Sequence, residues 1–312
     1  MKQHLTSLDG TPASRLAFGT MQFGGRADAG ASRAMFEDCL AAGITHFDTA
    51  HVYTGGASET LLGGMLGHGR ERLIIATKAA YDGGGGRTNI LQSAETSRQR
   101  MALDVIDILY MHRFDPDTDL HESFDAFAEL HGKGQIRYVG VSNFAAWQVV
   151  KAAAIARTFG LEIAVIQPMY NLVKRQAEVE ILPMAADQGI AVAPYSPLGG
   201  GLLTGKYTSG ETGRLTEDDR YAARYSKAFM HCAAEGLQKI AEETGMHSAT
   251  LAVAWAAAHE AHPTPIISAR SSQQLAPSLA AMTYEMSPEV YARLTALSPA
   301  PPPATDRLEE QS

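Results

Sequence analysis

The chain has 312 residues, 45% of them hydrophobic and 19% charged, which predicts a folded protein with a large core rather than a disordered chain. Its formal net charge is −8 and its lysines and arginines form no cluster, so we expect no nucleic-acid partner. No apolar run approaches a membrane span or a signal peptide, so we expect no membrane association and a cytoplasmic location.

The first predicted element is a hairpin. The N-terminal segment reads HLTSLDGTPASRLAFGT, and the pair Asp9-Gly10 between two short alternating runs is typical of a hairpin turn.

Short apolar runs, many of them β-branched, then recur along the chain. They are LAFGT (16–20), THFDTA (45–50), LIIATK (73–78), VIDILYMH (105–112), IRYVGVSN (136–143), IAVIQPMY (163–170), IAVAPYSP (190–197) and PIISA (265–269). Stretches with helical spacing lie between them, among them those that begin at Ser32, Glu95, Leu120 and Ala177, and glycines suited to a helix stop follow at Gly43, Gly132 and Gly189. This alternation predicts an α/β fold, a (β/α)8 TIM barrel over residues 1–297, with the hairpin plugging its N-terminal end.

Three segments depart from the simple repeat. About seventy residues separate the seventh and eighth runs, which is too long for a plain crossover: we expect a polar loop over 199–224 and then extra helices around Gln238 and Trp255. The run GGGG at 83–86 reads as a flexible connector, and the proline-rich, acidic residues 298–312 as a flexible tail.

Polar residues collect where the predicted strands end. In order they are Asp48, Lys78, His112, Ser142 with Asn143, Gln167, Tyr195 with Ser196, and Ser268. Taken singly, Asp48 reads as a turn or cap residue, Lys78 as a surface lysine and His112 as a hydrogen-bonded core histidine. Because the C-terminal ends of barrel strands meet at one face, the set together predicts one shared site.

These residue types suit the protonation of a developing alkoxide. Tyr53, on the loop after Asp48, keeps its proton near neutral pH and can act as a general acid if a cation stabilises its phenolate. Lys78 is the expected cation, Asp48 would keep it charged, and His112 would hydrogen-bond the substrate oxygen. The hydride must come from a cofactor, although no GxGxxG fingerprint opens a helix after a strand.

Seven segments give the chain a family resemblance: FDTAHVY, IIATK, ILYMHRFDP, VGVSNF, IQPMYN, PYSPLGGGLLTGKY and PIISARSSQQL. Their order and approximate spacing resemble those of aldo-keto reductases, over nearly the whole chain from Leu5 to Leu297. The resemblance implies a (β/α)8 barrel that binds NADPH in an extended form without a Rossmann domain. It also implies a catalytic tetrad of Asp48, Tyr53, Lys78 and His112.

The resemblance further implies the residues that hold NADPH or NADP+. Ser142, Asn143 and Gln167 would hold the nicotinamide carboxamide, with Tyr195 stacked on its ring and Thr20, Met21 and Asp48 nearby. Ser196, Pro197, Leu198 and Lys206 would lie at the pyrophosphate. Arg270 and Gln274 would bind around the 2′-phosphate and adenosine, with Arg224 as a second candidate at that end. Ser268 and Ser278 stand where related sequences often have Gly and Asn, and Arg270 favours NADP over NAD.

The predicted function is the NADPH-dependent reduction of a small aldehyde or ketone to an alcohol, with Tyr53 as general acid. Specificity is expected to reside in the loops at 79–89, 113–119 and 199–224. One alternative is a non-catalytic NADP(H)-binding regulatory subunit resembling potassium-channel β subunits. Another is a metal-dependent hydrolase with His46, Asp48, His51 and His112 as ligands, because His46 and Asp48 would share a strand face. The sequence leaves the oligomeric state open.

Overall fold

The computed structural model describes residues 5–207, 210 and 212–305, and its strands form one parallel sheet. Their spatial order is β7-β6-β5-β4-β3-β2-β1-β8. The strands are β1 (Ala17–Gly19), β2 (His46–Asp48), β3 (Ile74–Ala79), β4 (Ile106–Met111), β5 (Ile136–Ser142), β6 (Ile163–Gln167), β7 (Ala191–Val192) and β8 (Ile266–Ile267). Every predicted run therefore contains one strand, and the predicted sheet is confirmed.

The two outer strands of this order, β7 and β8, meet and close the sheet. Thr264 N donates to Val192 O at 2.8 Å, Ile266 N donates to Pro194 O at 2.8 Å, and Tyr195 pairs with Ile266 in a parallel bridge. The architecture is the predicted (β/α)8 barrel.

Alternation along the strands separates an inner and an outer core. Ala17, Ile74, Ile108, Val165 and Ile266 belong to one apolar cluster inside the barrel. Their strand neighbours, such as Phe18, Phe47, Ile75 and Leu109, belong to a second cluster under the helices. Side chains two positions along a strand from an inward-facing residue also face inward. The last side chains of several strands therefore lie at the C-terminal opening of the barrel, here called the barrel mouth.

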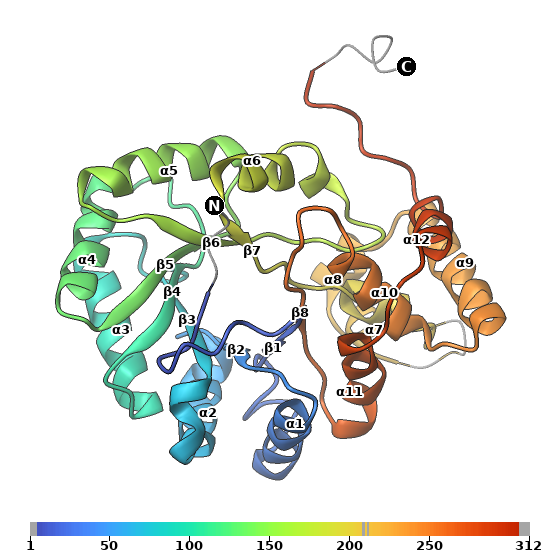
Figure 1. Cartoon of the computed structure of the whole chain (residues 1–312), viewed down its shortest axis with the longest axis horizontal. Coiled ribbons are helices and arrows are strands. Elements are labelled where there is room, and N and C mark those ends of the chain that lie inside the picture. The colour runs from blue at the N-terminus through green and yellow to red at the C-terminus, as the bar shows by residue number, and fades with distance from the viewer. Residues whose placement is uncertain (1–4, 208–209, 211, 306–312) are drawn as a thin grey trace.

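The helices lie outside the strands (Figure 1). They are α1 (Ala29–Ala41), α2 (Ala57–Leu66), α3 (Arg87–Met101), α4 (Leu120–Gly132), α5 (Ala146–Thr158), α6 (Ile181–Gln188), α7 (Arg214–Glu217), α8 (Asp219–Arg224), α9 (Ala228–Thr244), α10 (Ser248–Ala257), α11 (Ser272–Leu279) and α12 (Pro288–Thr295). Short 3-10 turns are η1 (Tyr53–Gly56), η2 (Gly67–Arg72), η3 (Gln176–Glu178), η4 (Gly199–Thr204) and η5 (Ala280–Met282).

Two helix boundaries differ from those predicted. Gly132 is the last residue of α4 rather than its stop, and the left-handed residue that follows is Gly134, at φ 68°. The helix expected from Ala177 begins at Ile181, because η3 uses the preceding residues. Gly189 does end α6 in the left-handed conformation, as predicted.

The segment between β7 and β8 contains more helix than predicted. The patterns around Gln238 and Trp255 form α9 and α10, which confirms the extra helices before the last strand. The expected polar loop over 199–224 was wrong in part, because η4, α7 and α8 lie within it. Helix α8 is capped by Asp218, whose side chain accepts from Arg220 N at 3.0 Å.

The predicted hairpin is present at the N-terminal end of the barrel. Ser7 N donates to Thr11 O at 2.8 Å, and Ala13 N donates to Leu5 O at 2.9 Å. The Leu5 side chain packs within the apolar cluster inside the barrel. The hairpin thus plugs this end, as predicted.

A buried ion network fastens the hairpin to the strands. Arg137 Nη1 donates to Thr6 O at 2.7 Å and to Asp107 Oδ1 at 2.7 Å, and Arg70 Nη2 lies 2.6 Å from Asp107 Oδ2. Asp107, on β4, is completely buried and also accepts from Ile75 N at 2.9 Å. One carboxylate thus connects two arginines, a neighbouring strand and the hairpin.

The glycine run and the tail differ in how they are held. Gly85 N donates to Asp115 Oδ2 at 2.7 Å and Ser123 Oγ donates to Gly85 O at 2.6 Å, so the run at 83–86 is fastened to the β4–α4 loop and to α4. Residues 299–305 contain no helix or strand and lead away from the barrel beyond α12 (Figure 1), and the rest of the predicted tail lies outside the described residues. Among the helices described, none has the length and apolarity to cross a bilayer.

Candidate active site

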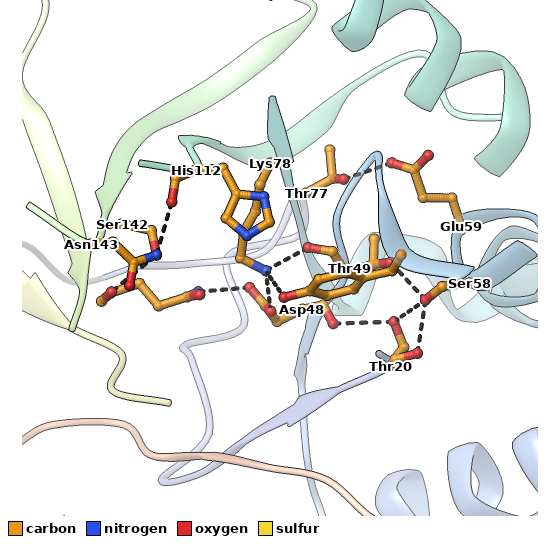
Figure 2. A network of polar contacts seen from close by, with 12 residues as sticks. Thr20, Asp48, Thr49, Ser58, Glu59, Thr77, Lys78, His112, Ser142 and Asn143 are labelled. Carbon is orange, nitrogen blue, oxygen red and sulfur yellow. Dashed lines mark hydrogen bonds and ion pairs between the residues drawn. The ribbon is translucent and has the colours of Figure 1, made fainter. Parts of the chain in front are cut away.

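The strand register brings the predicted residues together at the C-terminal ends of the strands. Asp48, Lys78, His112, Ser142 and Gln167 each stand at even spacing from inward-facing residues of their own strand, and all five are buried. Figure 2 shows Asp48 and Lys78 in contact, with His112 next to Lys78 and with Ser142 and Asn143 on the left of the view.

Lys78 is the centre of the site. Its ammonium lies 2.5 Å from Asp48 Oδ1, 2.7 Å from Thr49 O and 3.3 Å from the hydroxyl of Tyr53. Burial alone would lower the pKa of Lys78, but the Asp48 carboxylate and the Tyr53 phenol outweigh it and raise that pKa. The lysine is therefore held as a cation inside the barrel.

Tyr53 reaches the site from η1, directly after β2. Burial raises the pKa of the Tyr53 phenol, and the positive charge of Lys78 offsets part of that rise. Tyr53 therefore carries its proton at neutral pH, next to a cation that can stabilise the phenolate.

His112 faces Tyr53 edge-on, with ring centroids 5.9 Å apart. Burial, together with the charges of Lys78 and Arg113, lowers the pKa of His112 to about 3. Its imidazole is therefore neutral at physiological pH. On its other side lies the ring of Tyr81, at 4.8 Å, which in turn packs under the guanidinium of Arg113 at 4.7 Å.

A chain of hydrogen bonds joins the tetrad to the predicted nicotinamide residues. Gln167 Nε2 donates to the second oxygen of Asp48 at 2.8 Å, and Ser142 Oγ donates to Gln167 O at 3.1 Å. Asn143 Nδ2 donates to His112 O at 2.9 Å, and Tyr195 OH donates to Asn143 Oδ1 at 2.7 Å. Asn143 has a left-handed backbone, at φ 58°, which turns its exposed amide toward the barrel mouth.

The predicted pyrophosphate residues form the turn after β7. Ser196 has φ 61°, Pro197 is buried and Leu198 is half-buried. Three glycines follow, and a Cβ added to Gly201 would lie 3.0 Å from Cε of Lys206. Gly201 also has φ 98°, a conformation that favours glycine, and the Lys206 side chain lies close against it.

Arg270 lies in a small cluster of charges after β8. Its Nη2 is 3.6 Å from Glu217 Oε2 on α7, and the same oxygen receives Arg26 Nη1 at 2.7 Å. Burial, followed by the charge of Arg26, lowers the pKa of Arg270, and Arg214 acts in the same direction. The backbone N of Arg270 donates to Gln274 Oε1 at 3.3 Å. Two arginines, Arg26 and Arg270, thus share one carboxylate.

Several predicted cofactor residues are placed differently. Thr20 is buried, with Oγ1 against Asp48 O at 3.2 Å and Ser58 Oγ at 2.8 Å, so its hydroxyl supports β2 from within. Among the described residues, the buried hydroxyls of Ser278 and Ser268 have no hydrogen-bond partner. Met21 is 37% exposed after β1.

Arg224, the second candidate for the 2′-phosphate end, packs on the ring of Tyr221, with its guanidinium carbon 5.1 Å from the ring centroid.

The proposed metal ligands do not assemble. His46 is completely buried, and burial lowers its pKa to about 4. His51 turns toward Arg100, whose Nη1 lies 3.4 Å from His51 Nδ1. In the described part of the chain no three His, Cys, Asp or Glu side chains gather in a way that would hold a metal ion.

Some residues of the site escaped the sequence analysis. Thr49 contributes a backbone oxygen to Lys78, and Ser58 hydrogen-bonds both Thr20 and Thr49, at 2.8 and 2.9 Å. Buried Glu59 and half-buried Arg100 form an ion pair behind the Tyr53 loop. Ser58 and Glu59 begin α2 and read as ordinary first-turn residues, and the pattern of α3 contains nothing that marks Arg100.

A family model described as "Aldo/keto reductase family" matches residues 15–299. It includes all four members of the tetrad and the predicted cofactor residues.

The relatives include named enzymes and named channel subunits. "Uncharacterized oxidoreductase YrpG" of Bacillus subtilis (strain 168) is 33% identical over 94% of this chain and 94% of its own. "Probable voltage-gated potassium channel subunit beta" of Oryza sativa subsp. japonica is 30% identical over 95% of this chain and 96% of its own. "Aflatoxin B1 aldehyde reductase member 2" of Homo sapiens is 40% identical over 63% of this chain and 57% of its own.

Proposed function

Because the chain belongs to the aldo/keto reductase family of oxidoreductases, we propose that it reduces an aldehyde or ketone to the alcohol, with NADPH as hydride donor and Tyr53 as general acid. The observation that carries this proposal is the position of the Lys78 ammonium, 2.5 Å from Asp48 and 3.3 Å from the Tyr53 hydroxyl. A buried cation between a carboxylate and a phenol suits a tyrosine that must release a proton and take it back.

Each residue of the tetrad has a distinct part in this mechanism. Tyr53 holds the proton and gives it to the substrate oxygen, while Lys78 stabilises the phenolate that forms. Asp48 keeps the lysine charged. His112, as a neutral imidazole, orients the substrate carbonyl beside the Tyr53 hydroxyl.

The residues at the barrel mouth fit an extended NADPH. Amides at Asn143 and Gln167 and the Tyr195 ring suit the nicotinamide, which supplies the hydride when bound. The glycine turn lets the Lys206 side chain lie close to backbone that carries no side chains, and a cation beside open backbone suits a pyrophosphate. Arg270 supports NADPH over NADH as the cofactor. Arg270 and Arg26 share the single carboxylate of Glu217, and the net positive charge that remains suits a phosphate monoester.

The substitution Tyr53→Phe tests the acid. We expect the rate of NADPH oxidation with a panel of simple aldehydes to fall by about 100- to 10,000-fold, because only the transferable proton is lost. The affinity for NADPH, measured by fluorescence titration, is expected to stay the same. A variant that keeps most of its rate would show that another group donates the proton.

A second candidate function is a non-catalytic NADP(H)-binding subunit of a potassium channel. It is favoured by the relative named as a channel β subunit, which matches 95% of this chain at 30% identity. The two functions separate in one pair of measurements on the purified protein: turnover with aldehydes, and stoichiometric binding to a channel partner. Negligible turnover together with such binding would favour the channel subunit.

A further inference from the structure

The loop that carries Tyr53 has a strained backbone. Directly after Tyr53, the residues Thr54, Gly55 and Gly56 take φ values of 48°, 63° and 98°. A β-branched residue in the left-handed region costs about 1–3 kcal/mol and persists only where its surroundings hold it. Thr54 Oγ1 donates to Phe23 O at 2.8 Å and accepts from Ser58 N at 3.0 Å.

Arg100 of α3 holds the same loop from the outside. Its Nη1 donates to His51 O at 2.8 Å, before Tyr53, and to Glu59 Oε2 at 3.0 Å, after it. Gly56 lies so close to this side chain that an added Cβ would be 2.4 Å from Arg100 Cζ. A single guanidinium therefore joins both ends of the turn and fills the space behind it.

Glu59 connects this guanidinium to the strand of Lys78. Its carboxylate is completely buried, and Oε1 accepts from Thr77 Oγ1 at 2.6 Å. Thr77 precedes Lys78 on β3, and because successive strand residues face opposite sides, Thr77 points out toward α2 while Lys78 points into the barrel. Figure 2 shows Glu59 and Thr77 in contact on the side of Lys78 away from Asn143.

We propose that Arg100 and Glu59 are positioning residues, which set the separation between the Tyr53 hydroxyl and the Lys78 ammonium by bracing the loop against β3. This inference rests on the proposed role of Tyr53 as the acid. The stabilisation of a phenolate by a cation weakens as the distance grows. A turn released from the brace would leave the phenol farther from Lys78, and its pKa would rise.

The other groups that face Tyr53 must be kept constant in any test. They are Asp48 on β2, Lys78 on β3, His112 after β4, Tyr195 after β7 and Tyr221 on α8. The hydrogen bonds and ion pairs of Arg100 with described residues are to His51 and Glu59 and to none of these five, so we expect substitution of Arg100 to act on Tyr53 through the loop.

The test combines a direct titration with kinetics. Tyr53 is replaced by 3-fluorotyrosine, and the pKa of this phenol is followed by ¹⁹F NMR in the parent, in Arg100→Met and in Arg100→Met/Glu59→Gln. The double variant removes one charge of each sign, so a pKa shift that it retains reflects position and not net charge. The matched control is Arg98→Met on the same helix, because Arg98 pairs with Glu95 at 2.6 Å on the surface.

We expect a higher phenol pKa in both Arg100 variants than in the parent. We also expect kcat to fall by about 10- to 100-fold, with unchanged NADPH affinity, as for a misplaced catalytic group. Arg100→Lys, which keeps a cation beside Glu59, should restore part of the loss, and it serves for the comparison if Arg100→Met does not fold.

An unchanged phenol pKa in the Arg100 variants would overturn the proposal, even if kcat fell, because the residues would then be only structural. The titration needs no turnover. An inactive parent protein would therefore refute the proposed reductase function, while the titration would still decide whether the brace positions Tyr53.

Discussion

At the scale of single residues, the site depends on a lysine that remains charged inside a barrel. Lys78 has no exposed side-chain surface, and its compensation comes from Asp48, Thr49 O and Tyr53 together. A buried charge is tolerated only when paired and hydrogen-bonded. The three partners lie on or just after β2, so the ends of two adjacent strands are enough to build the acid.

His112 gives a prediction for the pH dependence. Its pKa lies near 3, below the ordinary value of 6.5, so the imidazole stays neutral as pH falls from about 8 to about 5 and gains its proton only in stronger acid. We expect kcat/KM for aldehyde reduction to show no inflection near 6.5. An inflection there that disappears in His112→Gln would mean that the imidazolium takes part.

Asp48, Lys78 and His112 could be grouped from the sequence because each stands at the end of a recognisable strand, and Tyr53 follows on the loop after Asp48. Period-two alternation then makes Asp48, Lys78 and His112 face one another without further information. For Thr20 and Ser278 the cofactor role stays a prediction, because sequence position does not reveal whether a hydroxyl faces the mouth or the interior. Glu59 and Arg100 meet only through tertiary packing, 41 positions apart.

At the scale of elements, α7 is the helix that the sequence predicts least well, because it lies within the segment expected to be a polar loop. It has four residues, too few for a helical period to show, and it forms beside tertiary partners rather than from propensity alone. Its Glu217 nevertheless joins the loop after β1 to the loop after β8 through Arg26 and Arg270. This helix thus lies where the proposed 2′-phosphate would bind.

Glu217 is expected to compete with that phosphate for Arg270. The variant Glu217→Gln should bind adenosine 2′,5′-bisphosphate about two- to fivefold more tightly by calorimetry, because a partly exposed ion pair contributes at most about 1 kcal/mol. Binding of adenosine 5′-phosphate should not change. Glu289→Gln, on exposed α12, makes the same change in charge as a control, and equal effects in the two variants would argue against local competition.

At the scale of the whole molecule, the barrel could be predicted because its repeat is carried by many short segments, each with its own period. The end of a helix is harder to predict where two nearby glycines can both follow its last turn, as Gly132 and Gly134 can at the end of α4. The closure through Thr264 and Ile266 is a long-range pairing that no local pattern encodes.

The opposite end of the barrel should affect stability and not catalysis. Asp107→Asn leaves Arg70 and Arg137 without their buried carboxylate, and we expect the free energy of unfolding in urea to fall by about 3 kcal/mol. The kcat of the folded protein should be unchanged, because the proposed catalytic groups lie at the other end of the strands. Asp125→Asn, which removes an exposed partner of Arg87, is the control and should cost less than about 1 kcal/mol. A large loss of kcat in Asp107→Asn would show that the two ends are coupled.

The N-terminal hairpin closes one end of the barrel, and the candidate site lies at the opposite end. Below Lys78 the interior is filled by Ile74, Ala76 and Ile108 and sealed by Leu5. No chain of hydrogen-bonded groups leads from the closed end to Tyr53 among the residues that the structure describes. In the proposed mechanism the proton that replaces the one given to substrate therefore reaches Tyr53 from the mouth or past the loop that carries it, and not through the closed end.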